Sequence, residues 1–252
     1  MDINSSNMRT VLIRPRRARK EWLVMRLPAF FVQRTSKRST AMEEEKEFSL
    51  SETAQKEMLC LARKALEIAV AENEKSPFTP IHRLISAAKD NLLKNYNPPD
   101  EKLKERWGIF VTLETVKSPQ EEELRGCIGT FEPREPLYEL AISYAIHSGF
   151  GDPRFERLNA KELPKIKIKI SVLSPLRRVK SPEEVIVGKH GIEIVRGFNS
   201  GCFLPEVATE YKMSREEFLS TCCSHKAGLP PDAWKDPKTE IYVFETFKFE
   251  EK

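Results

Sequence analysis

Apolar residues recur at helical spacing in the first half of the chain. Between residues 48 and 76, Ala, Leu, Ile and Met return every three or four positions, which predicts one long amphipathic helix. Ser49 and Glu52 stand at capping-box spacing near its start. A second helix is expected from Thr79-Pro80, with Thr79 as its cap and Pro80 at its first position.

The pattern changes to strand-like alternation after residue 106. Residues 107–113 predict one strand, and after a turn near Ser118 a second strand runs through residues 124–130. Over residues 165–172, Ile and Val alternate strictly with polar residues that are mostly lysine, which predicts a strand with one buried face and one solvated face. A solvated face accounts for these lysines better than a nucleic-acid contact does.

Two more helices are predicted in the second half. Residues 137–145 show helical spacing, and Gly149 provides a stop signal after them. Ser214 and Glu217 form a second capping box ahead of an apolar stretch.

Short strands complete the predicted fold. Residues 192–204 predict a hairpin, and residues 241–244 predict a final strand that continues to Phe249. Strands and helices do not alternate regularly along the chain. This order favours an α+β fold with an antiparallel or mixed sheet flanked by helices.

Composition narrows the class of protein. The 252 residues, of which 40% are hydrophobic and 32% charged, suffice for one large domain or two small subdomains. No apolar run approaches the roughly 20 residues that span a bilayer, and Arg26 and Pro28 interrupt the early apolar cluster, so we expect neither a membrane segment nor a secretory signal. Five scattered cysteines favour a reducing compartment, and we expect a cytoplasmic protein.

The first 42 residues differ sharply in charge from the rest. They hold ten Lys and Arg against two acids, which leaves 32 bases and 36 acids in the remainder. Three interpretations are open: a nucleic-acid-binding arm, an organelle transit peptide, or a segment outside the functional domain. We favour the third interpretation, a segment outside the functional domain. It is then either a disordered tail or the result of a chain that starts at Met42 instead of Met1. The mildly acidic remainder argues against nucleic acid as a partner.

One segment, Leu124-Arg125-Gly126-Cys127-Ile128-Gly129-Thr130, is the first candidate for chemistry. Its glycines permit close backbone approach, and a neighbouring guanidinium lowers the pKa of a thiol. In a regular strand Arg125 and Cys127 share a face, so Cys127 is a candidate nucleophile that Arg125 activates. The alternative is a small, inert, buried thiol.

The second candidate is Gly149-Phe150-Gly151-Asp152-Pro153-Arg154-Phe155. Asp152 can accept hydrogen bonds, and Arg154 can bind a carboxylate or phosphate with two nitrogens. The alternative is a rigid turn in which the two satisfy the backbone or each other. With His147 nearby in sequence, a Cys127–His147–Asp152 catalytic triad is a further hypothesis.

Other polar groups give weaker signals. Glu206 follows the predicted hairpin. Two interpretations are open for it, a buried acid in a cleft and an exposed turn residue. Cys222-Cys223-Ser224-His225 lacks the two separated pairs typical of zinc sites, so we expect packing and no metal. The sequence has no GxGxxG, P-loop or HExxH motif, which removes support for the common nucleotide and zinc chemistries, and it leaves the cofactor unknown.

Residues 124–130 resemble the hallmark segment of the AMMECR-one family. Further segments resemble the same family in the same order, over residues 47–249. They are Gly151-Asp152-Pro153-Arg154-Phe155, Ile170-Ser171-Val172-Leu173-Ser174-Pro175, His190-Gly191-Ile192, Leu204-Pro205-Glu206-Val207-Ala208 and Lys226-Ala227-Gly228-Leu229. Glu206 departs from the family pattern, in which glutamine is common, and this puts its role in doubt.

The resemblance implies two subdomains with the Cys127 segment facing a cleft between them. It also implies association with a Memo-like protein and a radical-SAM protein, and it brings no established reaction. Two functions follow as hypotheses. One is a thiol-dependent enzyme for a small polar substrate, with Cys127 and Arg125 catalytic and Gly126, Gly129, Thr130, Asp152, Arg154 and Glu206 binding. The other is a non-catalytic binding or scaffold module.

Overall fold

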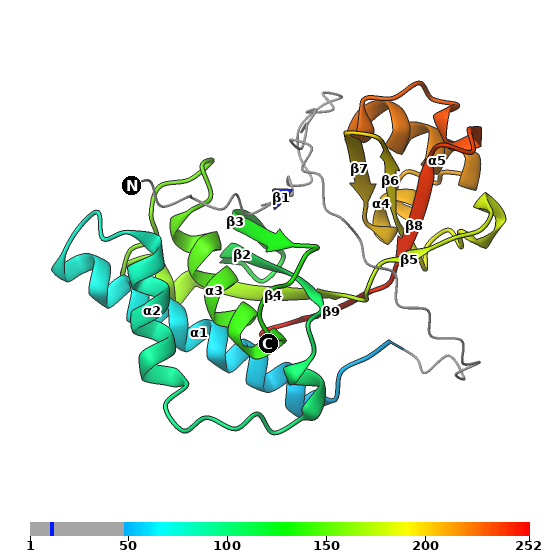
Figure 1. Cartoon of the computed structure of the whole chain (residues 1–252). Helices are drawn as coiled ribbons and strands as arrows, with labels where there is room; N and C mark the ends of the chain where they lie inside the picture. The colour runs from blue at the N-terminus through cyan, green and yellow to red at the C-terminus, as the bar shows by residue number, and fades with distance from the viewer. Residues whose placement is uncertain (1–10, 13–47) are drawn as a thin grey trace, which may run out of the picture. The chain divides into compact units, whose positions relative to one another are not determined.

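The structure is a computed structural model that describes residues 11–12 and 48–252 (Figure 1). The interpretations of the basic tail therefore concern residues outside the described part, apart from the two-residue strand β1 (Val11–Leu12). The described chain forms two compact units, and each is considered by itself. The first contains Leu50–Leu173 and Phe247–Lys252 with β1, and the second contains Ser174–Thr246.

The first unit packs three helices with a five-stranded sheet (Figure 1). The helices are α1 (Glu52–Lys75), α2 (Ile81–Leu92) and α3 (Leu137–Phe150). The strands β2 (Gly108–Ser118), β3 (Glu121–Thr130), β4 (Ile166–Leu173) and β9 (Thr246–Glu250) join β1 in the order β1-β3-β2-β4-β9. Helix α3 contacts β2 and β3, so the face of the sheet that carries Val111 and Leu113 is buried under it.

The second unit holds a four-stranded antiparallel sheet. Its strands are β5 (Arg177–Arg178), β6 (Gly191–Arg196), β7 (Asn199–Phe203) and β8 (Glu240–Phe244), in the order β5-β8-β6-β7. Helices α4 (Pro205–Glu210) and α5 (Arg215–Cys222) accompany it, with a π-helical turn at Cys223–Ala227. Short 3-10 turns lie at Glu101–Lys104, Leu163–Lys165, Pro182–Glu184 and Ala233–Lys235. The predicted α+β class is confirmed.

Several predicted boundaries were wrong by a few residues. The cap of α1 is Ser51, whose hydroxyl accepts from the Ala54 amide at 3.1 Å, and not Ser49. Helix α3 passes through Gly149 and ends at Phe150, with Gly151 as its C-cap. The Ser214 capping box was correct.

The last predicted strand is divided between the two sheets. β8 belongs to the sheet of the second unit and β9 to that of the first, with Glu245 between them. The Glu245 amide donates to the Ser174 hydroxyl at 2.9 Å, so this residue leaves the ladder. Glu206, predicted as an acid in a cleft or as an exposed turn residue, lies in the first turn of α4 and is half-buried. Within residues 11–12 and 48–252, no helix combines the length and apolar character that a bilayer span requires.

Candidate functional site

The segment Leu124–Thr130 lies inside strand β3 and is not a loop. It pairs antiparallel with β2, with Leu113 opposite Gly126 and Glu114 opposite Leu124, so Arg125 is the extra residue of a β-bulge. A bulge interrupts the alternation of side chains between the two faces of a strand. Simple alternation therefore no longer supports the prediction that Arg125 and Cys127 share a face.

The two glycines of the segment permit close packing within the protein. A Cβ built at Gly126 would lie 2.1 Å from the Ser148 carbonyl oxygen of α3. A Cβ built at Gly129 would lie 2.2 Å from the Ile109 carbonyl oxygen and 2.4 Å from the Phe110 ring. Any larger residue at either position would have to displace backbone, so packing alone accounts for both glycines.

Ser148 ties α3 into the ladder between β2 and β3. Its hydroxyl donates to the Val111 carbonyl at 2.7 Å and accepts from the Ile128 amide at 3.0 Å. The hydroxyl thus bridges two residues that face each other across the strands. Because these polar groups are buried, losing the bridge would leave unsatisfied donors and acceptors in the core.

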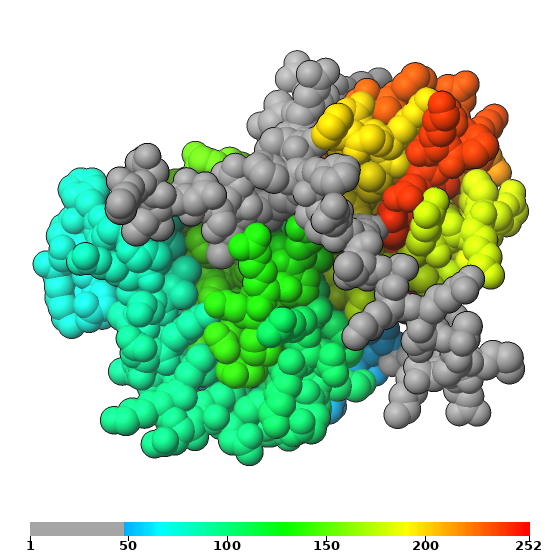
Figure 2. Space-filling model, viewed as in Figure 1, coloured from blue at the N-terminus to red at the C-terminus, as the bar shows by residue number. Residues whose placement is uncertain are grey.

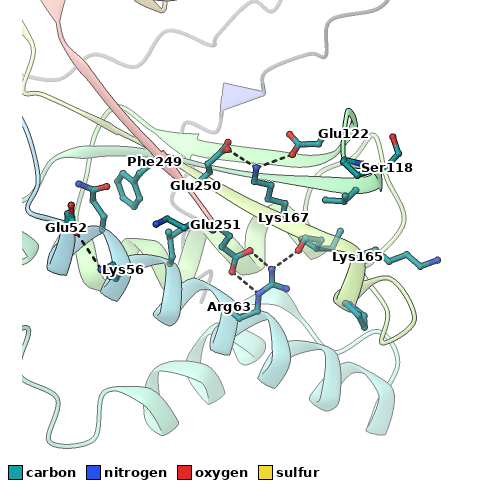
Figure 3. A pocket seen from close by; sticks show the side chains of 17 residues that line it. Glu52, Lys56, Arg63, Ser118, Glu122, Lys165, Lys167, Phe249, Glu250 and Glu251 are labelled. Atoms are coloured by element: carbon teal, nitrogen blue, oxygen red, sulfur yellow. Dashed lines mark hydrogen bonds and ion pairs between the residues drawn. The ribbon is translucent and has the colours of Figure 1, made fainter.

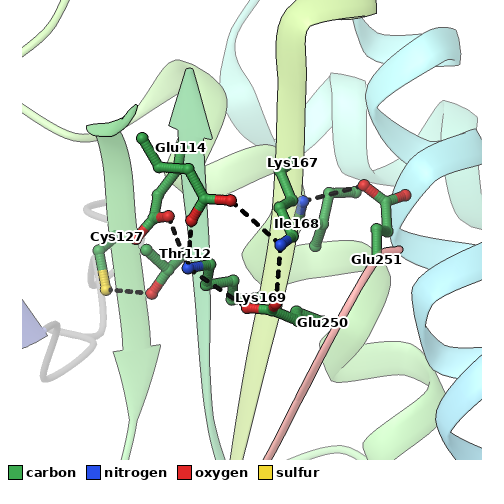
Figure 4. A network of polar contacts seen from close by, with 9 residues as sticks. Thr112, Glu114, Cys127, Lys167, Ile168, Lys169, Glu250 and Glu251 are labelled. Carbon is green, nitrogen blue, oxygen red and sulfur yellow. Dashed lines mark hydrogen bonds and ion pairs between the residues drawn. The ribbon is translucent and has the colours of Figure 1, made fainter. Parts of the chain in front are cut away.

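Cys127 is fully buried, with 0% of its surface exposed. Its Sγ lies 3.0 Å from the Oγ1 of Thr112, its cross-strand partner on β2 (Figure 4). Thr112 in turn pairs with Lys169 on β4, so a thiol, a hydroxyl and an ammonium group form one row across three strands. In this conformation the thiol is a hydrogen-bonded packing group that a substrate does not reach.

A charged network continues from this row along the same face of the sheet (Figure 4). The Lys169 ammonium lies 2.7 Å from a Glu114 oxygen, 2.6 Å from Glu122 and 3.3 Å from Glu250. Lys167 lies 3.1 Å from Glu122 and 2.7 Å from Glu250. Lys167 and Lys169, which were predicted on a solvated face, are therefore engaged in ion pairs, with 20% and 30% of their side chains exposed.

The two inner carboxyl groups of the network, those of Glu114 and Glu122, have pKa values that are shifted in opposite directions. Burial raises the pKa of Glu114, and the nearby Glu122 raises it further. Lys169 lowers this pKa but does not outweigh the two other effects. Hydrogen bonds that Glu122 accepts, first from Lys169 and then from Glu114, lower its pKa to about 2. Burial alone would lower the pKa of Lys169, but its bonds to these carboxylates outweigh burial and raise it.

Asp152 fastens the segment after α3 to the edge of β3. Its side chain is only 1% exposed, and it accepts from the Cys127 amide at 2.9 Å. Arg154 donates to it from its amide, Nε and Nη2, at 3.1, 2.8 and 2.6 Å. Burial opposes ionisation of Asp152, but these bonds prevail and lower its pKa.

The hydrogen bonds of Asp152 do not favour the predicted Cys127–His147–Asp152 triad. Both oxygens of the carboxylate that would orient the imidazole are occupied by Arg154 and the Cys127 amide. His147 lies within α3, where burial lowers its pKa. Its ring lies 5.6 Å from that of Tyr144. The pairing of Asp152 with Arg154 supports the alternative of a rigid turn.

Arg125 is held by two acceptors and has one nitrogen without any. Its Nε lies 2.7 Å from a Glu162 oxygen, and its Nη2 lies 2.8 Å from the Glu156 carbonyl. Its Nη1 is buried and has no hydrogen-bond partner among residues 48–252. The guanidinium lies over the Phe155 ring at 5.6 Å, and Arg154 lies over the same ring at 5.5 Å. Two guanidinium groups thus converge on one aromatic ring.

Glu206 belongs to a different compact unit from the other predicted site residues. It belongs to α4 of the second unit and is half-buried, whereas the other seven belong to the first unit. Its carbonyl accepts from the Thr209 hydroxyl at 3.0 Å. Thr130, at the end of β3, uses its hydroxyl to accept from the Glu132 amide at 3.0 Å.

A groove of about 980 Å³ lies at one end of the first unit (Figure 3). α1, the β2–β3 turn, the start of β4 and the last residues of the chain line it. Arg63 pairs with Glu251 there, and Lys167 pairs with Glu122 and Glu250. None of the predicted site residues lines this groove.

The Cys222–His225 segment lies in the core of the second unit. Cys222 and Cys223 are buried, and the Cys222 thiol lies 3.5 Å from the Gly201 carbonyl. Burial raises the pKa of both thiols. Across the part of the chain that the structure describes, no group of three or more His, Cys, Asp and Glu side chains is arranged to hold a metal ion.

Comparison with known proteins identifies the family. A family model described as AMMECR1 matches residues 59–249. The chain belongs to the AMMECR1 family. It is 47% identical over 161 residues to Protein MK0488 of Methanopyrus kandleri. The aligned region covers 61% of this chain and 76% of MK0488. It is 40% identical over 166 residues to Protein PH0010 of Pyrococcus horikoshii, which covers 63% and 80%.

The crystal structure of uncharacterized protein PH0010 shares the fold. It matches with a TM-score of 0.58 and 34% sequence identity, and the match covers 78% of this chain and 92% of that chain. The AMMECR1 resemblance and the α+β class are thus confirmed.

Sequence reasoning missed several residues that shape the AMMECR1 candidate site. They are Thr112, Ser148, Phe155, Glu162 and Lys169. Phe155 stood within the second candidate segment and received no role. Thr112 could be found by pairing the two predicted strands, because it lies directly opposite Cys127. No local pattern marks Ser148 or Glu162, since their contacts join residues 20 and 37 positions apart.

Proposed function

We propose that this AMMECR1-family protein is a binding module for an acidic group, a carboxylate or a phosphate, at Arg125 and Arg154. The observation that carries the proposal is the Nη1 of Arg125, a buried donor with no acceptor in the described part of the chain. A buried donor of this kind costs about 1–3 kcal/mol, or more when it is charged. A ligand oxygen that reaches Nη1 would remove that cost, and a guanidinium binds carboxylate or phosphate readily.

The surroundings of the two arginines define the kind of acid. Glu162 pairs with Arg125 at 2.7 Å and Asp152 pairs with Arg154 at 2.6 Å, so each guanidinium is already partly neutralised. The site therefore suits a single acidic group that accepts directed hydrogen bonds, and it suits a polyanion less well. Both guanidinium groups lie over the half-buried Phe155 ring, so a ligand at Arg125 and Arg154 would lie beside this ring.

Titration calorimetry with succinate and with inorganic phosphate tests this proposal. Arg125→Lys keeps the charge beside Glu162 but removes Nη1, and we expect it to weaken binding at least tenfold. Arg178→Lys is the matched control, because Arg178 is an exposed arginine that pairs with Glu240. Equal affinity of the Arg125 and Arg178 variants for both probes would refute the proposal.

The proposed acidic group can also belong to a partner protein. The family resemblance implies a Memo-like protein and a radical-SAM protein, either of which can carry an acidic side chain or terminus. Titration of each purified candidate against wild type and Arg125→Lys would show whether the arginine site takes part. An interface that depends on Arg125 would identify the acidic group as part of a protein, and binding of succinate or phosphate alone would identify a small molecule.

A thiol-dependent enzyme acting on a small polar substrate is the second candidate. One contact favours it: the Thr112 hydroxyl lies 3.0 Å from Cys127 Sγ and can donate to a thiolate. The burial of Cys127 and the pairing of Arg125 with Glu162 weigh against it. Catalysis would require exposure of the sulfur, which cysteine alkylation in the folded protein measures directly.

A further inference from the structure

An apolar loop, residues 185–189, precedes β6 in the second unit. Its Ile186 and Val187 side chains are 51% and 36% exposed, although both are β-branched apolar residues. Figure 2 shows the lime-coloured segment that contains this loop at the surface of the molecule. The neighbouring Val185 is buried, and its carbonyl accepts from Arg215 Nε at 2.9 Å. One end of the loop is thus anchored, whereas its middle is exposed.

His190 closes the other end of this loop. Its Nδ1 accepts from the Ile186 amide at 3.1 Å, and its own amide donates to the Ile186 carbonyl at 2.9 Å. The residue is buried, with 5% of its surface exposed. A Cβ built at the next residue, Gly191, would lie 2.3 Å from the Phe244 ring, so the backbone after His190 has little room to move.

We propose that His190 is a pH-sensitive latch that holds the apolar loop when its imidazole is neutral and releases it on protonation. The reason is the hydrogen bond from the Ile186 amide. Nδ1 accepts a hydrogen bond only while it carries no proton, and in the imidazolium both ring nitrogens are donors. Protonation therefore replaces an attraction by a contact between two N–H groups, and it frees the Ile186 amide.

Charged groups from several elements face the imidazole. Arg177 of β5 and Lys189 of the loop disfavour its protonation, and Glu245, after β8, favours it. Each is itself paired, Arg177 with Glu184 at 2.8 Å and Lys189 with Glu245 at 3.2 Å. The Glu184 carbonyl also favours the protonated ring.

The direction of the latch follows from these surroundings. Burial, followed by Arg177, lowers the pKa of His190 below its usual 6.5. The released loop therefore binds the proton more readily than the latched loop. The latched state is fully stable above the usual pKa and loses stability as the pH falls through the lowered one.

Amide hydrogen exchange measured by NMR between pH 5 and 7.5 tests the latch on the full chain. We expect protection of the Ile186 amide, corrected for intrinsic exchange, to fall at least tenfold as His190 becomes protonated. The Val185 amide is the internal reference, because it donates to the Pro182 carbonyl at 3.1 Å and not to a titrating group. Its protection should stay constant.

A matched variant separates the latch from a general loss of structure. In His190→Asn the side-chain oxygen takes the place of Nδ1 as an acceptor but does not titrate, so Ile186 should stay protected throughout the range. The same loss of protection in this variant as in wild type would overturn the proposal. If the variant does not fold, the wild-type protein alone still tests the proposal. Different pH midpoints for protonation of the His190 ring and for loss of Ile186 amide protection would also overturn the proposal.

Discussion

Replacing Gly126 by alanine tests the claim that the hallmark segment is shaped by packing. The added Cβ would lie 2.1 Å from the Ser148 carbonyl oxygen, whereas an ordinary contact begins at 3.4 Å. The obstacle is backbone, so α3 and β3 must separate by more than about 1 Å to relieve the clash. We expect a large loss of stability from a change of a single methyl group.

The magnitude follows from the contacts that this separation would break. Overpacking of a core costs about 1–3 kcal/mol. Moving α3 also strains the two hydrogen bonds through Ser148, at 2.7 and 3.0 Å, each worth about 1 kcal/mol. The total is about 3–5 kcal/mol, which corresponds to a melting temperature lower by about 6–20 °C.

Gly149→Ala is the control in the same helix. The nearest atom to its added Cβ is the flexible end of Leu66, at 3.2 Å, and alanine favours a helix interior by up to about 1 kcal/mol. We expect this variant to stay within about 1 kcal/mol of wild type. Urea unfolding followed by circular dichroism measures both variants. If Gly126→Ala were as stable as Gly149→Ala, packing would not explain the glycine.

Two further predictions concern charged side chains. Asp152→Asn should lower stability by about 3 kcal/mol at pH 7, because Arg154 loses its buried partner. Since the pKa of Asp152 is lowered from its usual 3.8, the difference from wild type should shrink as the pH falls below about 4, and thermal melts from pH 2.5 to 7 would show a constant difference if this reasoning were wrong. Lys169→Met should destabilise the protein by about 2–3 kcal/mol at pH 7, because three carboxylates lose their shared ammonium, and less at pH 4. Lys117→Met, at a more exposed ion pair, should lose less stability than Lys169→Met in the same urea titrations, and equal losses would count against the network.

Local patterns predicted the elements that depend on neighbouring residues. The strict alternation over residues 165–172 corresponds to β4, and the Ser214–Glu217 capping box starts α5 as expected. Both signals involve residues two to four positions apart, which the sequence displays directly. The wrong cap for α1 arose because two serines, Ser49 and Ser51, precede the same helical pattern, and only tertiary structure selects between them.

The candidate site was predicted less well because its contacts cross the chain. Asp152 and Arg154 were correctly considered as a mutually bonded pair, since they are two residues apart. The bond between Asp152 and the Cys127 amide, the Ser148 bridge and the Arg125–Glu162 pair all depend on how α3 and the following segment pack on β3. Gly126, beside the bulge at Arg125, was a sequence signal for it, because a glycine inside a strand pattern often marks a bulge.

Alkylation of each cysteine in the folded protein, mapped by mass spectrometry, tests the central claim that the site binds and Cys127 does not react. Cys60 is exposed and serves as the positive reference, and the buried Cys222 and Cys223 serve as negative references. We predict that Cys60 is modified from pH 6 to about 8.5 while Cys127 stays protected until the protein unfolds. Modification of Cys127 in the folded protein as fast as that of Cys60, or faster below about pH 8.5, would contradict the binding-module account and favour a thiol enzyme.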